Sequence, residues 1–285
     1  MKHNWNAYAR LMRLDKPVGI YLLLWPTLWA LLMAAQGLPP LGITLIFVAG
    51  VVVMRSAGCV INDYADRKVD GSVKRTAQRP LATGEVSAKQ ALQLFAALIA
   101  LAFVLVLFLN WQTIALSVVA LLLAASYPFV KRYTNLPQVV LGAAFGWAIP
   151  MAFMAVIETV PAYGWWLFIA NLLWTVAYDT MYAMVDRDDD LQIGIKSTAI
   201  LFGKNDVLIV MLLQAAALAI LWCIGCAINA TWPYYIAVLF SALLCVRQYQ
   251  LIKRSQREGC FTAFIENHYI GLAITLGTAL HFYLV

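Results

Sequence analysis

The stretch Leu41–Asp70, LGITLIFVAGVVVMRSAGCVINDYADRKVD, begins as an apolar run and ends in a cluster of amide, acidic and basic side chains. Its apolar part, residues 41–61, is long enough to cross the hydrocarbon core of a bilayer as a helix. Similar apolar blocks, separated by short polar segments, recur through the 285 residues, of which 63% are hydrophobic and 12% are charged. This composition excludes an ordinary water-soluble globule and indicates an integral membrane protein built from helices.

We predict an all-α, polytopic fold, with residues 1–285 forming a single membrane-embedded domain of nine transmembrane helices. The first eight predicted spans divide into two parallel four-helix halves, about 18–127 and 139–250, and the ninth is appended to them. The predicted spans are 18–35, 41–61, 91–109, 113–127, 139–157, 163–185, 207–228, 234–250 and 269–285.

The lysine and arginine residues predict how these spans are oriented. Nineteen of the twenty lie in alternate polar segments, whereas the intervening segments near residues 36–40, 110–112, 158–162 and 229–233 contain none. Because basic residues gather on the cytoplasmic side of a membrane, the N-terminus is predicted to be cytoplasmic and the C-terminus periplasmic. The same bias accounts for the net charge of +6, so this charge does not indicate a nucleic-acid partner.

Acidic side chains concentrate at the cytoplasmic ends of two predicted spans. The first group follows the second predicted span. If the helix of this span continues through the group, a rotation of about 100° per residue places these side chains within an arc of about 100° around the helix axis. By the same reckoning, the second group falls within about 40° on the sixth span, with Asp188 on the opposite side. The first group is Asn62, Asp63, Asp66 and Asp70, and the second is Asp179, Asp186 and Asp190.

Two interpretations of these acidic groups stay open. Carboxylates at a membrane surface are often only a solvated helix end, but like charges stacked along one helix face destabilise it unless a cation is present. A donor set made only of oxygen atoms suits Mg²⁺, which is typically held by a few carboxylates together with phosphate oxygens. We therefore predict a magnesium site.

Basic residues follow both acidic groups. Arg75 and Arg79 lie four residues apart after the first group, and Lys196 follows the second. Arginine and lysine beside carboxylate-bound Mg²⁺ are the usual means of holding a diphosphate. The alternative for each of them is the general excess of basic residues on the cytoplasmic side.

Arg55 is the only basic residue inside a predicted span. An arginine at the centre of a membrane helix costs about 2.5 to 3.5 kcal/mol on an insertion scale, so it should have an anionic or polar partner. Helical phase places Arg55 on the same face as Asn62 and Asp66. It is predicted either to form a permanent ion pair with an aspartate or to bind a small anionic acceptor below the metal site.

Three motifs, RSAGCVINDYADRKVDGSVKRTAQRPLATG, YPFVKRYTNLPQ and YDTMYAMVDRDDDLQIGIKST, resemble the UbiA superfamily of intramembrane aromatic prenyltransferases. The resemblance implies a bundle around a central cavity capped by two cytoplasmic loops, in a bacterial cell inner membrane with the active site facing the cytoplasm. It also implies Mg²⁺-dependent transfer of a polyprenyl group from polyprenyl diphosphate to an aromatic acceptor. The closest match of the motifs implies 4-hydroxybenzoate as this acceptor, in a step of ubiquinone biosynthesis, with membrane lipid around the bundle.

The resemblance also implies roles for individual residues. Those expected to hold the metal are Asn62, Asp63, Asp66, Asp70, Asp186 and Asp190. Those expected to bind the diphosphate are Arg75, Arg79, Lys131 and Tyr127, with Lys196 added from its position. Those expected to bind the acceptor are Arg55, Asp179 and Tyr182, and those expected to act in catalysis are Asp66, Asp179 and Asp186.

Three alternatives stay open at this point. The acceptor could be homogentisate, dihydroxynaphthoate or a porphyrin side chain. A secondary transporter could also carry repeats and charges inside the membrane, but its sites tend to lie near the midplane on broken helices. A scaffold protein would leave the two acidic groups unexplained. Prenyl chain length and oligomeric state cannot be predicted from this sequence.

Overall fold

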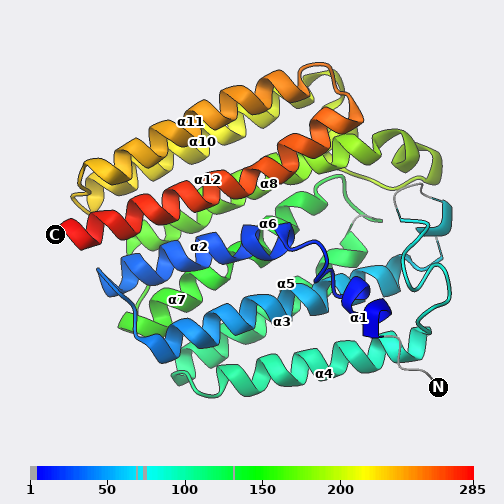
Figure 1. Ribbon diagram of the computed structural model, residues 1–285, viewed down its shortest axis with the longest axis horizontal. Helices are drawn as coiled ribbons and strands as arrows, with labels where there is room; N and C mark the ends of the chain where they lie inside the picture. The colour runs from blue at the N-terminus through cyan, green and yellow to red at the C-terminus, as the bar shows by residue number, and fades with distance from the viewer. Residues whose placement is uncertain (1–4, 69, 73–75, 131) are drawn as a thin grey trace.

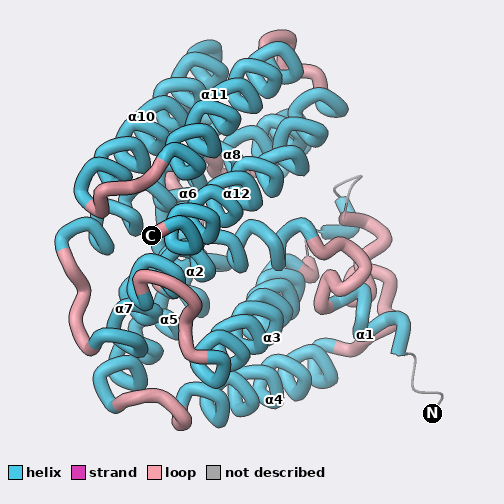
Figure 2. Tube along the Cα trace, turned by 60° about the vertical axis from the view of Figure 1, so that its left-hand side comes forward, coloured by secondary structure: helices cyan, strands magenta, loops and turns pink. Residues whose placement is uncertain are grey.

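The computed structural model describes residues 5–68, 70–72, 76–130 and 132–285, which form helices and loops with no strand among them (Figure 2). The α-helices are α1 (Trp5–Leu11), α2 (Val18–Ala35), α3 (Leu41–Asp66), α4 (Ala88–Val106), α5 (Trp111–Val130), α6 (Pro137–Gly146), α7 (Ala148–Ile157), α8 (Ala162–Ile193), α9 (Thr198–Phe202), α10 (Asp206–Ala227), α11 (Trp232–Ile252) and α12 (Arg257–Leu284). Two 3₁₀ turns, η1 (Asp70–Ser72) and η2 (Gly203–Asn205), complete the described elements.

Seven helical segments of this described chain are long and apolar enough to cross a membrane. They are Val18–Ala35, Leu41–Asp66, Ala88–Val106, Trp111–Val130, Pro137–Ile157, Thr198–Ala227 and Trp232–Ile252. The other two predicted spans fall on α8 and α12, which are helices of 32 and 28 residues that carry many polar side chains. The all-helical membrane fold is thus confirmed, and the count of nine spans stays a prediction.

The predicted span 139–157 contains two helices, because the helix is interrupted at Trp147 between α6 and α7. Pro150 lies three residues after this break and four residues after Gly146, and proline has no N–H with which to bond the carbonyl of Gly146. The short helix α1 was not predicted. It buries Ala7 and Leu11 in a small apolar cluster with residues of α3 and α4.

The helices form a bundle in which α10 and α11 lie on one side, α4 lies on the other, and α8 and α12 run between them (Figure 1). The core is built around large aromatic side chains, and two of their indole nitrogens bond to α12. The indole nitrogen of Trp29 donates to Thr275 at 2.9 Å, and that of Trp174 donates to Asn267 at 2.9 Å. These bonds fix α12 against α2 and α8, since an unsatisfied buried N–H would be costly.

The polar connections gather at one end of the bundle. The connections from α3 to α4, from α8 to α9 and from α11 to α12 all lie at the end opposite the C-terminus (Figure 1). The ends of α3 and α8 that carry the two acidic groups therefore point to the same end of the bundle. This parallel arrangement is what the sequence predicts for the second and sixth spans.

Candidate active site

A cavity of about 1590 Å³ lies inside the bundle, lined by residues of α2 to α8 and of α12. Its charged lining includes Arg13, Asp63 and Arg79, which lie at or beyond the ends of α2 and α3. Its lining from α4 and α5 is mostly apolar, with residues such as Ile99 and Leu121. The cavity therefore joins a charged region to an apolar one, as an amphiphilic ligand with an anionic head and an apolar tail would require.

The first acidic group lies at the charged end of this cavity. Asp63 is only 1% exposed, and its two carboxylate oxygens accept hydrogen bonds from Nη2 of Arg13 at 3.0 and 2.8 Å. Nη1 of Arg79 lies 2.9 Å from Oδ1 of Asp63 and 3.0 Å from Oδ2 of Asp70. Two guanidinium groups thus stabilise carboxylates that burial alone would disfavour in their charged form.

The single helical arc predicted for the first acidic group is wrong at Asp70. The helix α3 ends at Asp66, and Asp70 begins the 3₁₀ turn η1, so Asp70 is not on the face that carries Asp63 and Asp66. The bridge through Arg79 nevertheless holds Asp70 beside Asp63. Burial raises the pKa of the Asp70 carboxyl; Arg79 opposes this rise, and the charges of Asp63 and Asp66 add to it.

The donors of the first acidic group suit a hard cation. Asn62, Asp63, Asp66 and Asp70 offer oxygen ligands, and three of them are carboxylates. Over the described ranges, however, no three Asp, Glu, His or Cys side chains are arranged to hold a metal ion. Asp63 and Asp70 each contact a guanidinium group, so a cation that binds them would share these carboxylates with the arginines or replace the arginines.

The second acidic group lies on α8, which is helical through Asp190 as predicted. Among the described acidic residues of this helix, only Asp179 lines the cavity. Tyr182 of the same helix also lines it. The ring of Tyr182 lies 4.6 Å from that of Phe264 on α12, and Asp186 is 8% exposed. Asp188 faces away, as predicted: its side chain is 74% exposed and lies 3.4 Å from Arg257.

Arg55 lies on the cavity wall formed by α3. Its Nη1 donates to Sγ of Cys59 at 2.7 Å, and its guanidinium carbon lies 6.0 Å from the centre of the Phe145 ring. Its Nε is buried without a hydrogen-bond partner. No ion pair is found between Arg55 and a carboxylate of the described residues, so this part of the chain does not show the permanent ion pair with an aspartate.

The residues predicted to bind diphosphate are only partly brought together. Arg79 and Tyr127 line the cavity. Lys196 is exposed, and its Nζ donates to the carbonyl of Tyr133 at 3.3 Å, so it links the segment after α8 to the one after α5. Arg75 and Lys131 lie outside the described residues.

Arg13 belongs to this site, although the sequence analysis assigns it no role there. It occupies the turn between α1 and α2 with a backbone φ of 59°. Its Nη1 donates to the carbonyl of Arg10 at 2.7 Å, while its Nη2 binds Asp63, 50 residues away. Helical phase could not have found this contact, because the two residues lie on different elements.

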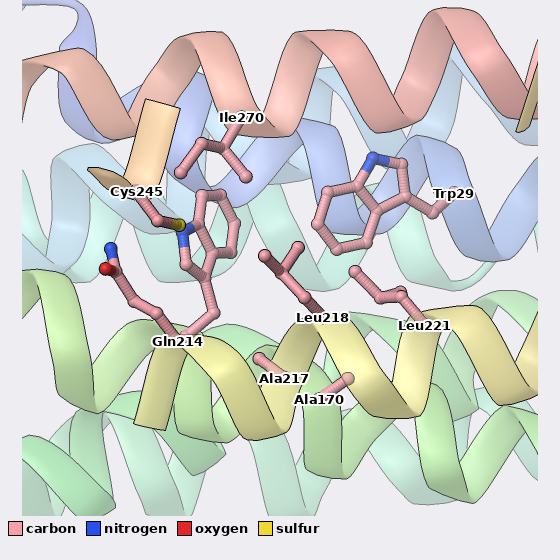
Figure 3. Close-up of a pocket in the computed structure, with 9 residues that line it drawn as sticks. Trp29, Ala170, Gln214, Ala217, Leu218, Leu221, Cys245 and Ile270 are labelled. Atoms are coloured by element: carbon pink, nitrogen blue, oxygen red, sulfur yellow. The ribbon is translucent and has the colours of Figure 1, made fainter. Parts of the chain in front are cut away.

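A second pocket, between α2, α8, α10, α11 and α12, is too small for a substrate. Its volume is about 10 Å³, and it is lined by apolar side chains such as Trp29 and Leu218 with Gln214 at one end (Figure 3). A volume of this size holds about one water molecule at most. The large cavity is therefore the candidate active site.

The fold and this site define the class of the protein as a multi-pass membrane protein with a charged ligand cavity inside its bundle. Residues 23–273 match the UbiA prenyltransferase family, and the chain belongs to this family. It is 65% identical over 279 residues to the 4-hydroxybenzoate octaprenyltransferase of Pseudoalteromonas atlantica, covering 98% of each chain. It is 63% identical over 277 residues to the 4-hydroxybenzoate octaprenyltransferase of an Enterobacter species, covering 97% of this chain and 96% of that one.

Solved structures have the same fold. A UbiA homologue from Aeropyrum pernix K1 superposes with a TM-score of 0.80 at 25% identity, covering 91% of this chain and 97% of that one. A UbiA homologue from Archaeoglobus fulgidus, bound to GPP and Mg²⁺, superposes with a TM-score of 0.69 at 19% identity, covering 97% of each chain. The predicted family and its fold are thereby confirmed.

Proposed function

We propose that this protein transfers a polyprenyl group from polyprenyl diphosphate to the ring carbon ortho to the hydroxyl of 4-hydroxybenzoate. The product would be 3-polyprenyl-4-hydroxybenzoate, an intermediate of ubiquinone biosynthesis. The names of the most similar relatives support this reaction. The observation that carries it is Arg55: a cation on the wall of a largely apolar cavity, without a described carboxylate partner, suits a small aromatic carboxylate.

The acidic residues of both groups would hold Mg²⁺, namely Asn62, Asp63, Asp66 and Asp70 on one side and Asp186 and Asp190 on the other. When bound, this metal would supply positive charge that stabilises the departing diphosphate. The Archaeoglobus fulgidus homologue, which has the same fold, is bound to GPP and Mg²⁺. Asp66 and Asp186, both buried, would anchor the two groups.

The basic residues would bind the diphosphate of the polyprenyl donor. The position of Arg79 supports this role, because its side chain lines the cavity beside Asp63 and Asp70. Arg75, Lys131, Tyr127 and Lys196 complete the proposed set. On this proposal, the guanidinium of Arg79 moves from carboxylate to phosphate oxygens, which keeps the buried charges paired throughout.

The residues deeper in the cavity would orient the acceptor. Arg55 would bind its carboxylate, and Asp179 and Tyr182 would lie beside its ring and hydroxyl. Asp179 would accept a hydrogen bond from the phenol hydroxyl and so raise electron density at the ortho carbon. The allylic C–O bond of the donor breaks, the ring carbon bonds to the prenyl carbon, and the ring loses a proton.

The proposed topology follows the distribution of basic residues. We place nine spans in the bacterial inner membrane, with the N-terminus and the active site facing the cytoplasm and the C-terminus in the periplasm. The gathering of the polar connections at one end of the bundle supports this orientation (Figure 1). The apolar part of the cavity would then take up the polyprenyl tail within the membrane, surrounded by lipid.

A membrane assay tests the reaction. Membranes containing the protein are given labelled 4-hydroxybenzoate and polyprenyl diphosphates of increasing length, with Mg²⁺ or with EDTA. We expect a prenylated acid only with Mg²⁺, and an Asp179→Asn variant with much reduced turnover. Failure to prenylate 4-hydroxybenzoate, with product formed from homogentisate or dihydroxynaphthoate, would move the protein to another acceptor class. Failure with every aromatic acceptor would refute the proposal.

A further inference from the structure

Three uncharged residues from three helices surround the guanidinium of Arg55. On α2, Gly19 leaves the space that it occupies: a Cβ at this position would lie 2.4 Å from Nε, 2.5 Å from Nη2 and 2.8 Å from Cζ of Arg55. On α3, Cys59 accepts the bond from Nη1. On α6, Phe145 presents its ring to the guanidinium at 6.0 Å.

These contacts orient the guanidinium without neutralising it. A thiol is a weak hydrogen-bond acceptor, and glycine contributes only space, so neither residue provides a counter-ion. The Nε group remains buried without a hydrogen-bond partner, which is costly unless a ligand satisfies it. Both Gly19 and Cys59 line the cavity, so a ligand that reaches Arg55 also reaches them.

We propose that Gly19 and Cys59 are positioning residues that aim Arg55 at the carboxylate of the acceptor and thereby select an aromatic acid over a neutral phenol. This inference rests on the proposed function and deepens it. A carboxylate held by a guanidinium prefers a planar approach with two parallel bonds, and this geometry depends on the orientation of the guanidinium. The two residues act through Arg55 and take no part in bond breaking or bond formation.

The sharpest test is Gly19→Ala, because the added methyl displaces the Arg55 side chain without removing any group from the site. The end of the flexible Arg55 side chain can move, so the fold should tolerate the substitution. The control is Gly42→Ala on α3, where an added Cβ meets no atom within 4 Å. We expect Gly19→Ala to raise the KM for 4-hydroxybenzoate by about fivefold or more, and Gly42→Ala to leave it unchanged.

Substitutions at Cys59 test the second half of the inference. Cys59→Ala removes the acceptor of the Arg55 bond and should raise the KM for 4-hydroxybenzoate, whereas Cys59→Ser keeps an acceptor and should stay close to the wild type. Cys59→Asp supplies a counter-ion one helical turn from Arg55, so it should reduce acceptor binding more than Cys59→Ala does. The KM for the polyprenyl diphosphate should remain the same in all these variants, which also shows that they fold.

The preference of the protein for a charged acceptor over a neutral one is measured by comparing 4-hydroxybenzoate with its neutral amide, 4-hydroxybenzamide. Wild-type protein should bind the acid more tightly than the amide, and Gly19→Ala and Cys59→Asp should reduce this preference. If Gly19→Ala and Cys59→Ala leave both the KM for the acid and the preference unchanged while the wild type is active, the inference is wrong. If the wild type prenylates neither compound, the proposed function itself fails.

Discussion

Replacement of Arg79 by glutamine is expected to destabilise the substrate-free protein by about 3 kcal/mol and to abolish turnover. The Arg79 side chain is 13% exposed and bridges Asp63, whose side chain is 1% exposed, to Asp70, whose side chain is 6% exposed. Removing one partner of a buried ion pair typically costs about 3 to 5 kcal/mol, because a charge is left buried without compensation. We expect the lower end of this range, since Arg13 still contacts Asp63.

The loss of stability in Arg79→Gln should depend on pH through Asp70. Burial already raises the pKa of this carboxyl, and Arg79 opposes the rise, so the pKa should rise further in the variant. A carboxyl with a higher pKa in the folded protein favours folding when it is protonated. The loss of stability should therefore be small below about pH 3.9, the pKa of an aspartate in the unfolded chain. It should grow as the pH rises through the pKa of Asp70 in the folded variant.

The measurement is the free energy of unfolding of the purified protein in detergent with a chelator present, between about pH 4 and pH 7.5. The control is Arg257→Gln: the Arg257 side chain is 41% exposed, so solvent screens its pairs with Asp188, which is 74% exposed, and with Asp189, which is 14% exposed. Exposed pairs of this kind contribute about 0 to 1 kcal/mol, so this variant should stay close to the wild type. A loss in Arg79→Gln as small as that of the control, or one that shrinks as the pH rises, would refute the argument.

Three further outcomes are expected. Arg55→Gln should raise the KM for 4-hydroxybenzoate by about tenfold or more without changing the KM for the polyprenyl diphosphate in steady-state assays; an equal rise in both would contradict its role. EDTA should stop turnover and added Mg²⁺ should restore it, and activity that persists in EDTA would exclude a metal role for the acidic groups. Ala124→Phe, on the apolar lining of the cavity, should lower turnover with octaprenyl diphosphate more than with geranyl diphosphate. Ala115 is exposed on the same helix, so Ala115→Phe should not lower turnover in this length-dependent way. Equal effects of the two variants would show that the polyprenyl tail does not bind in this part of the cavity.

The positions of the helices could be predicted well from hydropathy, but their places in the bundle could not. The predicted span 18–35 has the same bounds as α2, because a membrane helix ends where its apolar run ends. However, α2 and α5 have similar mean hydropathies of 1.8 and 2.1, although the protein buries them to very different extents. In the apolar segment of α2, 61% is buried inside the protein, and in that of α5 only 11% is. Lipid and protein core both select apolar side chains, so composition cannot distinguish a central helix from an outer one.

Helical phase predicted the site only in part, because Asp66 of α3 and Asp186 and Asp190 of α8 are not among the described residues that line the cavity. Asn62 and Asp63 line the cavity with Arg55, and Asp179 lines it from α8, as the shared helix faces suggested. The prediction failed where the chain leaves the helix, at Asp70, and where the partner comes from another segment, at Arg13. Periodicity describes neighbours along one element, and contacts between loops depend on tertiary packing that a single sequence does not express.

Two long helices, α8 and α12, are not apolar enough to count among the candidate membrane spans. Of the described helices, α8 and α12 are long enough to cross a bilayer but do not have the apolar composition of the other spans. Both contribute polar side chains to the cavity, Asp179 and Tyr182 from α8 and His268 from α12. Their contact is also polar, since Trp174 donates to Asn267. Polar groups inside a membrane persist only where they are satisfied or where they bind a ligand, so the cavity lining and the polar contact between α8 and α12 account for the lower hydropathy of these two helices.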